Sequence, residues 1–130
     1  KVKLFNDVFR ILKPCGLVTL VDWITPEDIG PSEEKLHMGD ISWKETESSY
    51  LILLKNCGFS DIQFFNENEA YIAYVKDLGE RLTSQSHKDA YRHLISEELR
   101  NELIISNEKL LDAIISGKQT AVMIRAARSF

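Results

Sequence analysis

The sequence predicts an α/β fold, a single domain in which helices and strands alternate along the chain. Residues 1–13 carry apolar side chains at helical spacing, and Pro14 and Gly16 end that helix. Residues 17–21 (Leu-Val-Thr-Leu-Val) follow at once as a strand of apolar and β-branched side chains. The length of 130 residues suits one domain with a hydrophobic core. Together these features predict a sheet that is packed by helices.

The strand over 17–21 has no polar face, which is typical of a strand covered on both sides, as in a parallel sheet. Two further strands are expected at 61–65 and 120–127. Three strands cannot bury the first of them on both faces, so we expect other elements to complete the sheet. Because the chain also begins inside a predicted helix, the simplest source of these elements is a missing N-terminal half.

The segment between the first two strands is predicted to contain a loop and a helix. Residues 24–41 include two prolines and two glycines, which predicts a loop with room for one helical turn. A long loop directly after a strand end is a favoured position for a lid over a binding site. Ser42 and Glu45 match a capping box, which predicts a helix that begins there and stops at residues 57–58.

The stretch 66–119 is predicted to be mostly helical. Apolar side chains at helical spacing predict helices at 69–83, 88–95, 97–105 and 107–115. Gly117 ends the last of them, and the closing strand at 120–127 follows. We therefore expect a helical insert ahead of the last strand.

The composition narrows the class of partner and the compartment. A formal net charge of −4 argues against nucleic acid or an anionic membrane surface as the main partner. Cys15 and Cys57 lie in no C-x-x-C pattern, and no Cys or His pair has the spacing of zinc ligands, so we expect no metal site. A reduced cytoplasmic protein is expected, since we find neither a signal peptide nor a membrane-spanning apolar run.

The candidate substrate-binding residues are acidic, aromatic or imidazole side chains near the ends of predicted elements. Asp22 and Trp23 close the central strand, where open α/β sheets bind ligands. The alternative is that the carboxylate caps the loop and the indole packs in the core. His37 lies in the predicted lid, where a surface histidine is the alternative. Tyr71 and Tyr74 lie on the first helix of the insert, where core packing is the alternative.

Three short motifs stand at the ends of predicted helices, just ahead of the predicted strands. Residues 12–16 (Leu-Lys-Pro-Cys-Gly), followed by an apolar strand and Asp22, are similar to the Leu-Lys-Pro-Gly-Gly motif that precedes the fifth strand of class I S-adenosylmethionine-dependent methyltransferases. Cys15 stands where the motif has its first glycine, and a cysteine is tolerated at such a position if its φ is negative. Residues 57–62 (Cys-Gly-Phe-Ser-Asp-Ile) resemble the Ala-Gly-Phe-x-x-Val stretch before the sixth strand, and residues 117–119 resemble the approach to the seventh.

The resemblance implies that residues 1–130 are the C-terminal part of one methyltransferase domain. Its Rossmann-like sheet would contain strands five to seven here, with residues 24–41 as a lid loop and residues 66–119 as a helical insert. A helical insert in this place is similar to the small-molecule N-methyltransferases that act on phosphoethanolamine or sarcosine. The cofactor would be S-adenosylmethionine, but the family's main binding motifs are absent, since the chain contains no G-x-G. We therefore assign no cofactor-binding residue to this chain.

The resemblance implies methyl transfer to a small-molecule acceptor, with this chain as the acceptor-side half. Asp22 and Trp23 would then face the acceptor, and an aromatic ring suits a cationic centre. The partner would be the missing N-terminal half or a second chain that completes the sheet. One alternative is a non-catalytic methyltransferase-like fragment that serves as a dimerisation or regulatory module. Another is an unrelated small α/β binding domain.

Overall fold

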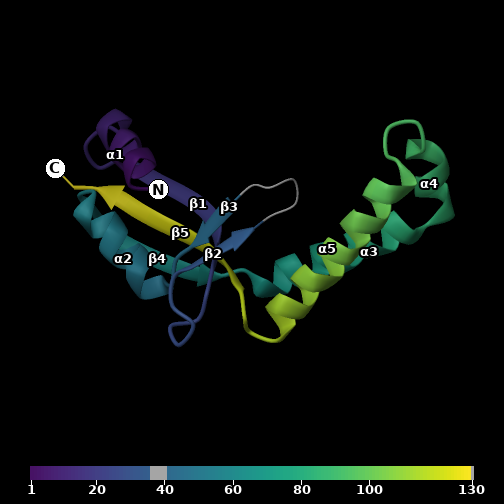
Figure 1. The fold of residues 1–130 in the computed structure, drawn as a ribbon. Helices are drawn as coiled ribbons and strands as arrows, with labels where there is room; N and C mark the ends of the chain where they lie inside the picture. The colour runs from purple at the N-terminus through teal and green to yellow at the C-terminus, as the bar shows by residue number, and fades with distance from the viewer. Residues whose placement is uncertain (36–40, 130) are drawn as a thin grey trace. The chain divides into compact units, whose positions relative to one another are not determined.

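The computed structural model describes residues 1–35 and 41–129, with the backbone alone for residues 34, 35 and 41. Helices and strands follow one another in mixed order (Figure 1). They are α1 (Val2–Ile11), β1 (Leu17–Ile24), β2 (Ser32–Lys35), β3 (Ile41–Lys44), α2 (Glu47–Asn56), β4 (Phe59–Asn66), α3 (Asn68–Thr83), α4 (Gln85–Tyr91), α5 (Glu97–Ile115) and β5 (Thr120–Arg128). The predicted α/β class is confirmed.

The chain divides into two compact units, one formed by residues 1–67 with 119–130 and the other by residues 68–118. The first unit contains a three-stranded sheet in the order β1-β5-β4. The last strand lies in the middle and runs antiparallel to both neighbours, so β1 and β4 run parallel to each other. Their carboxyl ends therefore lie at the same edge of the sheet.

One face of this sheet is packed by α1 and α2. Because side chains alternate along a strand, every second residue of β1 and β5 points to that face, and these positions are apolar with the exceptions of Asp22, Thr120 and Arg128. The buried cluster consists of Phe5, Ile24, Tyr50, Leu54, Cys57, Phe59, Val122, Ile124 and Ala126. Its centre is aromatic, since the Phe59 ring meets Phe5 and Phe9 edge-on at centroid distances of 6.4 and 5.3 Å. This burial is the main contribution to the stability of the unit.

The end of α1 is held by the last strand. The Arg128 guanidinium donates to the carbonyl oxygens of Phe9, Arg10 and Leu12, and it lies over the Phe9 ring at 4.8 Å. These carbonyls have no helical partner, so a cation at this end is favourable. Cys15 in the following turn has φ +62°. The condition under which a side chain would be tolerated here, a negative φ, is therefore not met, and Cys15 occupies a conformation that favours glycine.

The segment before α2 differs from the prediction. Ser32–Lys35 and Ile41–Lys44 pair as an antiparallel two-stranded sheet, so the loop predicted for 24–41 covers only part of that range. The helix predicted from Ser42 begins instead after Thr46, whose hydroxyl accepts a hydrogen bond from the Ser49 amide. Serine and glutamate at the predicted positions matched the capping pattern, but the true box uses Thr46 and Ser49. Strand pairing with β2 outweighed the local signal.

The second unit is helical, in agreement with the insert predicted for 66–119 between two strands. Helices α3 and α5 pack against each other and bury Val75, Leu82 and Ile114. The two helices predicted at 97–105 and 107–115 are one continuous helix. Ser106 and Asn107 suggested a break, but the Asn107 amide instead donates to the carbonyl of Val75 on α3 at 2.9 Å.

Candidate functional site

The carboxyl ends of β1 and β4 form the candidate site, because ligands of open α/β sheets bind outside the carboxyl ends of parallel strands. The register places Asp22 and Asn66 on either side of Val122, and Trp23 beside Ala121. This edge therefore carries a carboxylate, an indole and an amide within two residue positions of one another.

The Asp22 side chain lies on the helix-covered face of the sheet. Its Oδ2 accepts hydrogen bonds from the Tyr50 hydroxyl at 2.9 Å and from the Lys1 amine at 2.7 Å, and its Oδ1 accepts from the Trp23 amide. Burial and the nearby Asp22 carboxylate raise the pKa of Tyr50 above its ordinary value, so the phenol keeps its proton. The contacts with Lys1 and Tyr50 tie the carboxylate to the start of α1 and to α2, while the contact with the Trp23 amide lies within β1.

The Trp23 side chain lies on the opposite face, since it follows Asp22 in the alternation of the strand. It is half-buried. The structure therefore does not bring the two predicted residues together, although they are adjacent in sequence. An aromatic face at this strand end suits a cationic group.

A polar pair that the sequence did not reveal lies at the same end of the sheet. The Lys44 amine donates to Gln119 Oε1 at 2.5 Å, and the amide is only 7% exposed. Gln119 comes directly before β5, and Lys44 ends β3. A buried amide held by a cation can recognise a carboxylate or hydroxyl group. The position of Gln119 just before the last strand was the available signal, but its partner is 75 residues away.

The remaining predicted site residues are dispersed. His37 lies outside the described residues. Tyr71 is half-buried and Tyr74 is 60% exposed on α3. The two tyrosines differ in burial, and Tyr74 is too exposed for core packing to account for it. Their roles in binding an acceptor stay predictions.

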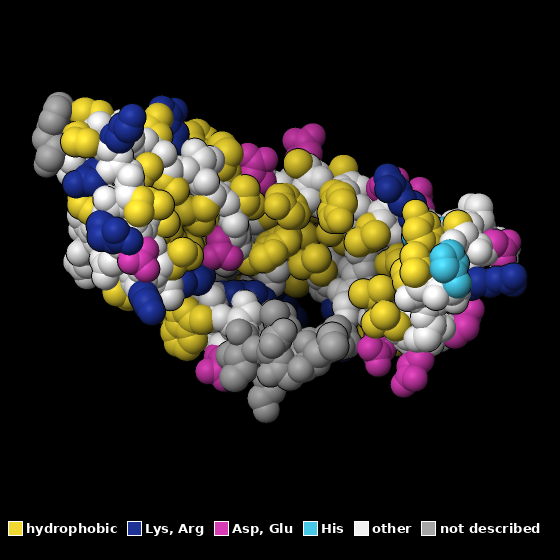
Figure 2. Space-filling view, turned by 90° about the horizontal axis from the view of Figure 1, so that it is seen from above, with side chains coloured by type: hydrophobic (Ala, Val, Ile, Leu, Met, Phe, Trp, Pro, Cys, Tyr) yellow, Lys and Arg dark blue, Asp and Glu magenta, His cyan; other side chains and the backbone are white. Residues whose placement is uncertain are grey.

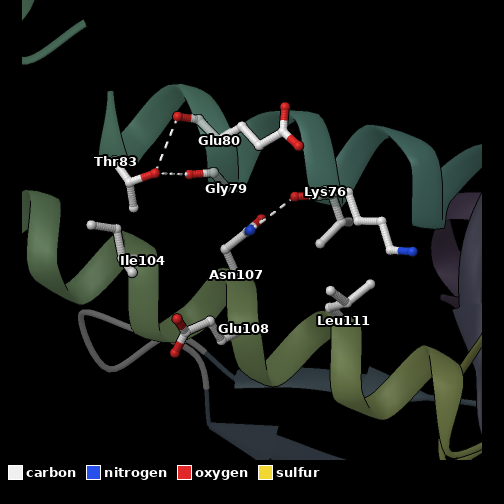
Figure 3. Close-up of a pocket in the computed structure, with 9 residues that line it drawn as sticks. Lys76, Gly79, Glu80, Thr83, Ile104, Asn107, Glu108 and Leu111 are labelled. Atoms are coloured by element: carbon white, nitrogen blue, oxygen red, sulfur yellow. Dashed lines mark hydrogen bonds between the residues drawn. The ribbon is translucent and has the colours of Figure 1, made fainter. Parts of the chain in front are cut away.

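A groove of about 290 Å³ lies between α3 and α5 (Figure 3). Gly79 creates it, because a Cβ at this position would meet the Asn107 amide at 2.9 Å. The amide itself is bonded to the helix opposite, and Thr83 donates back into α3. Charged side chains line the opening, namely Lys76, Glu80 and Glu108. We assign no chemistry to this groove.

A buried arginine is the second feature that the sequence prediction missed. Arg100 is 2% exposed, and its Nη1 lies 3.2 Å from the Leu82 carbonyl and 2.8 Å from His87 Nδ1. It joins the end of α3 to α4 and α5. The signal was its place in the spacing of residues 100, 104, 107, 111 and 114, which forms the inner face of α5.

The described residues contain neither a metal-binding cluster nor a membrane-spanning helix. Among residues 1–35 and 41–129 there is no group of three or more His, Cys, Asp or Glu side chains suited to a metal ion. Within the same ranges, no helix is long and apolar enough to cross a membrane.

Comparison with solved structures identifies the fold. The chain aligns over 100% of its length with a phosphoethanolamine N-methyltransferase from Haemonchus contortus, at TM-score 0.76 and 16% identity. It aligns over 98% with a protein described as a sarcosine dimethylglycine methyltransferase from Galdieria sulphuraria, at TM-score 0.77 and 19% identity. A cyclopropane synthase from Mycobacterium tuberculosis matches over 97%, at TM-score 0.76 and 16% identity.

These structures share the fold of this chain, which is that of a portion of the S-adenosylmethionine-dependent methyltransferases. The chain covers 30%, 47% and 49% of the three proteins, so it spans half or less of each. The Haemonchus enzyme was solved with S-adenosylhomocysteine and phosphomonomethylethanolamine. No protein-family model and no curated protein matches the sequence.

Proposed function

We propose that this chain is the acceptor-side, C-terminal half of an S-adenosylmethionine-dependent methyltransferase that acts on a small molecule. The observation that carries the proposal is the match of nearly the whole chain, at TM-score 0.76 to 0.77, to methyltransferases of known structure. The motif at residues 12–16 and the helical insert support the same assignment.

Methyl transfer is an in-line displacement at a sulfonium, and it depends mainly on the position of the acceptor. In this proposal Trp23 presents its aromatic face to the cationic centre. The Lys44–Gln119 pair recognises a polar group of the acceptor at the same strand ends. Asp22 contributes indirectly, because its carboxylate holds the end of β1 against Tyr50. Acceptor choice is assigned to the segment 24–41 with His37 and to the insert 66–119 with Tyr71 and Tyr74.

The proposal also assigns the cofactor to polypeptide outside these 130 residues, because the Gly-rich binding motif is absent. An N-terminal half of the same polypeptide is one source of the missing elements, and a partner chain is the other. The second candidate function is a non-catalytic dimerisation or regulatory module. An open reading frame that encodes no cofactor-binding elements ahead of these residues would favour this candidate.

The test compares the isolated 130-residue chain with the full product of the open reading frame that encodes it. Intact-mass spectrometry establishes the length of that product, and calorimetry measures S-adenosylmethionine binding to both samples. We expect saturable binding by the full product and none in the micromolar range by the isolated chain. Tight binding by the isolated chain would refute the assignment of the cofactor to polypeptide outside these residues. A full product that does not bind the cofactor would instead establish the non-catalytic candidate.

Transfer of a labelled methyl group to a panel of small amines, sarcosine included, then tests the acceptor side. Trp23→Ala is expected to raise KM for the acceptor more than Trp23→Phe, since phenylalanine keeps an aromatic face. Equal effects of the two substitutions would exclude the aromatic contact.

A further inference from the structure

A buried cation without a counter-charge lies inside the second unit. Arg100 on α5 is 2% exposed, and among the described residues no carboxylate forms an ion pair with it. Its Nη1 contacts two uncharged groups, the Leu82 carbonyl at 3.2 Å and His87 Nδ1 at 2.8 Å. Its Nη2 is buried and has no hydrogen-bond partner in the described part of the chain. Burial of a charge is costly unless an anion compensates it, so this guanidinium is suited to bind one.

The imidazole that faces Arg100 supplies a hydrogen bond but no negative charge. An arginine nitrogen can only donate, so His87 Nδ1 accepts and the neutral ring carries its hydrogen on Nε2. The other acceptor, the Leu82 carbonyl, is fixed in the backbone of α3. The His87 ring stands on a side chain that can rotate, so it is the acceptor that an anion can replace.

Helix α4, which carries His87, is held by few buried contacts. None of its residues is buried. Tyr91 at its end is 44% exposed and Leu94 in the following turn is 69% exposed, and apolar side chains are visible on the surface of this unit (Figure 2). A segment with few buried contacts opens at a low cost in free energy. Movement of α4 therefore gives access to the guanidinium while α3 and α5 stay packed.

We propose that Arg100 binds a small oxyanion, a carboxylate or a phosphate, when α4 moves His87 aside. One oxygen of the anion replaces His87 as the partner of Nη1, and a second accepts from Nη2, which is the two-point contact that a guanidinium favours. Because α3, α4 and α5 enclose Arg100, the site admits a small group and not a folded partner. The site lies wholly within the second unit, so the proposal does not rest on methyl transfer.

The first test supplies the anion from the protein itself, in the full product of the open reading frame. His87→Asp puts a carboxylate oxygen near the position of Nδ1, whereas His87→Asn puts a neutral amide oxygen there. We expect His87→Asp to melt at least about 2 °C above His87→Asn, because the buried cation gains a counter-charge. Thermal unfolding followed by circular dichroism is the measurement.

An aspartate in the first turn of a helix is itself favourable, so this comparison needs a matched control. Ser86→Asp and Ser86→Asn provide it, since Ser86 is exposed in the same turn of α4. A difference at position 87 that is no larger than the difference at position 86 would overturn the proposal. It would show that uncharged partners or water already compensate the guanidinium.

The second test measures the binding of inorganic phosphate and of acetate to the full product by calorimetry, at constant pH and ionic strength. We expect saturable binding by the wild type, and the two anions distinguish a phosphate site from a carboxylate site. His87→Asp should abolish binding, because its own carboxylate fills the site. His87→Ala should bind about threefold more tightly or better, because no imidazole competes for Nη1. The controls Arg92→Gln and His93→Ala remove an exposed cation and an exposed imidazole, and should bind as the wild type does.

Arg100→Gln should also abolish binding, and His87→Asp gives the same answer if that variant does not fold, because it keeps the arginine. Unchanged binding in His87→Asp would place the anion elsewhere and overturn the proposal. Failure of the wild type to bind either anion would overturn it too. If His87→Asp is nevertheless the more stable variant, the counter-charge comes from an acidic segment of polypeptide and not from a small molecule.

Discussion

The hydroxyl of Tyr50 on α2 donates to the carboxylate of Asp22 on β1 across 2.9 Å, and the two residues are 28 positions apart in the sequence. The Lys1 amine donates to the same oxygen and lies over the Tyr50 ring at 4.8 Å. Tyr50 is 1% exposed, so the hydrogen bond joins the core to the end of the strand that carries Trp23. Asp22, which the sequence predicts to contact substrate, therefore also stabilises the packing of the end of β1 against α2.

Removal of the Tyr50 hydroxyl should destabilise the first unit. In Tyr50→Phe the carboxylate of Asp22 loses a charge-assisted hydrogen bond while the aromatic packing stays, so we expect a loss of about 1–2 kcal/mol in the free energy of unfolding. Urea denaturation followed by far-UV circular dichroism measures it. The control Tyr74→Phe removes an exposed hydroxyl and should have little effect. An unchanged midpoint for Tyr50→Phe would show that water replaces the hydroxyl at no cost.

The same contact predicts a pH dependence at alkaline pH. The pKa of Tyr50 is raised in the folded chain, while the unfolded tyrosine titrates near its ordinary pKa of about 10. Above that pH the unfolded state loses a proton that the folded state keeps, so the contribution of the phenol is complete below pH 10 and falls as the pH rises. The stability difference between wild type and Tyr50→Phe should therefore narrow above about pH 10. Urea titrations at a series of pH values up to 11 test this, and a constant difference would contradict it.

The N-cap of α2 is Thr46 in the structure, whereas the sequence pattern predicts Ser42, and substitutions at the two positions distinguish them. Thr46→Ala removes the hydroxyl that accepts from the Ser49 amide, and should cost about 1 kcal/mol in the free energy of unfolding. Ser42→Ala is the matched control, because that serine lies in β3 and caps no helix. Thermal unfolding of both variants is the measurement. If Ser42→Ala is the more damaging change, the helix starts where the capping-box pattern first placed it.

The order of the elements was predictable because the strongest local signals coincide with their ends. The 14–16 turn, the glycine at 58 and the glycine at 117 each precede a strand in the structure. The β2–β3 pair was not predictable, since Ser32–Lys35 has no apolar residue and its strand form depends on the partner strand. The continuity of α5 through Asn107 likewise depends on a carbonyl of α3. Both depend on tertiary contacts, which local propensity does not encode.

The candidate site was predictable only as an edge of the sheet. The strand end at Asp22 and Trp23 could be recognised, but neighbours in a strand point to opposite faces, and the pattern did not settle which face was covered. The Lys44–Gln119 pair and the Arg100–His87 contact join distant segments. Such pairs have no signature in a single sequence, because only the fold brings their partners together.

Gly58 is required by the close approach of α1 to the turn after α2. It has φ +96°, and a Cβ there would meet the Phe9 ring at 2.9 Å. Gly58→Ala should therefore combine backbone strain of about 1–3 kcal/mol with displacement of an aromatic side chain of the core. Gly30→Ala is the matched control, with φ +77° and nothing within 4 Å of the added carbon, so it carries the backbone term alone. Denaturant midpoints should fall further for Gly58→Ala, and equal losses would show that the Phe9 ring moves aside freely.

At Cys15 the opposite substitution, from a side chain to glycine at a positive φ, should be stabilising. Its φ of +62° costs a non-glycine residue about 1–2 kcal/mol, and its side chain is exposed, so it gains little from packing. Cys15→Gly relieves this strain but adds flexibility to the unfolded chain, which returns roughly 0.5–1 kcal/mol. We expect a net rise of about 0.5–1 kcal/mol in the free energy of unfolding. Cys15→Ser controls for removal of the thiol and should leave stability unchanged, since serine meets the same strain. A gain for serine equal to that for glycine would mean that the thiol, and not the backbone conformation, is the source of the cost.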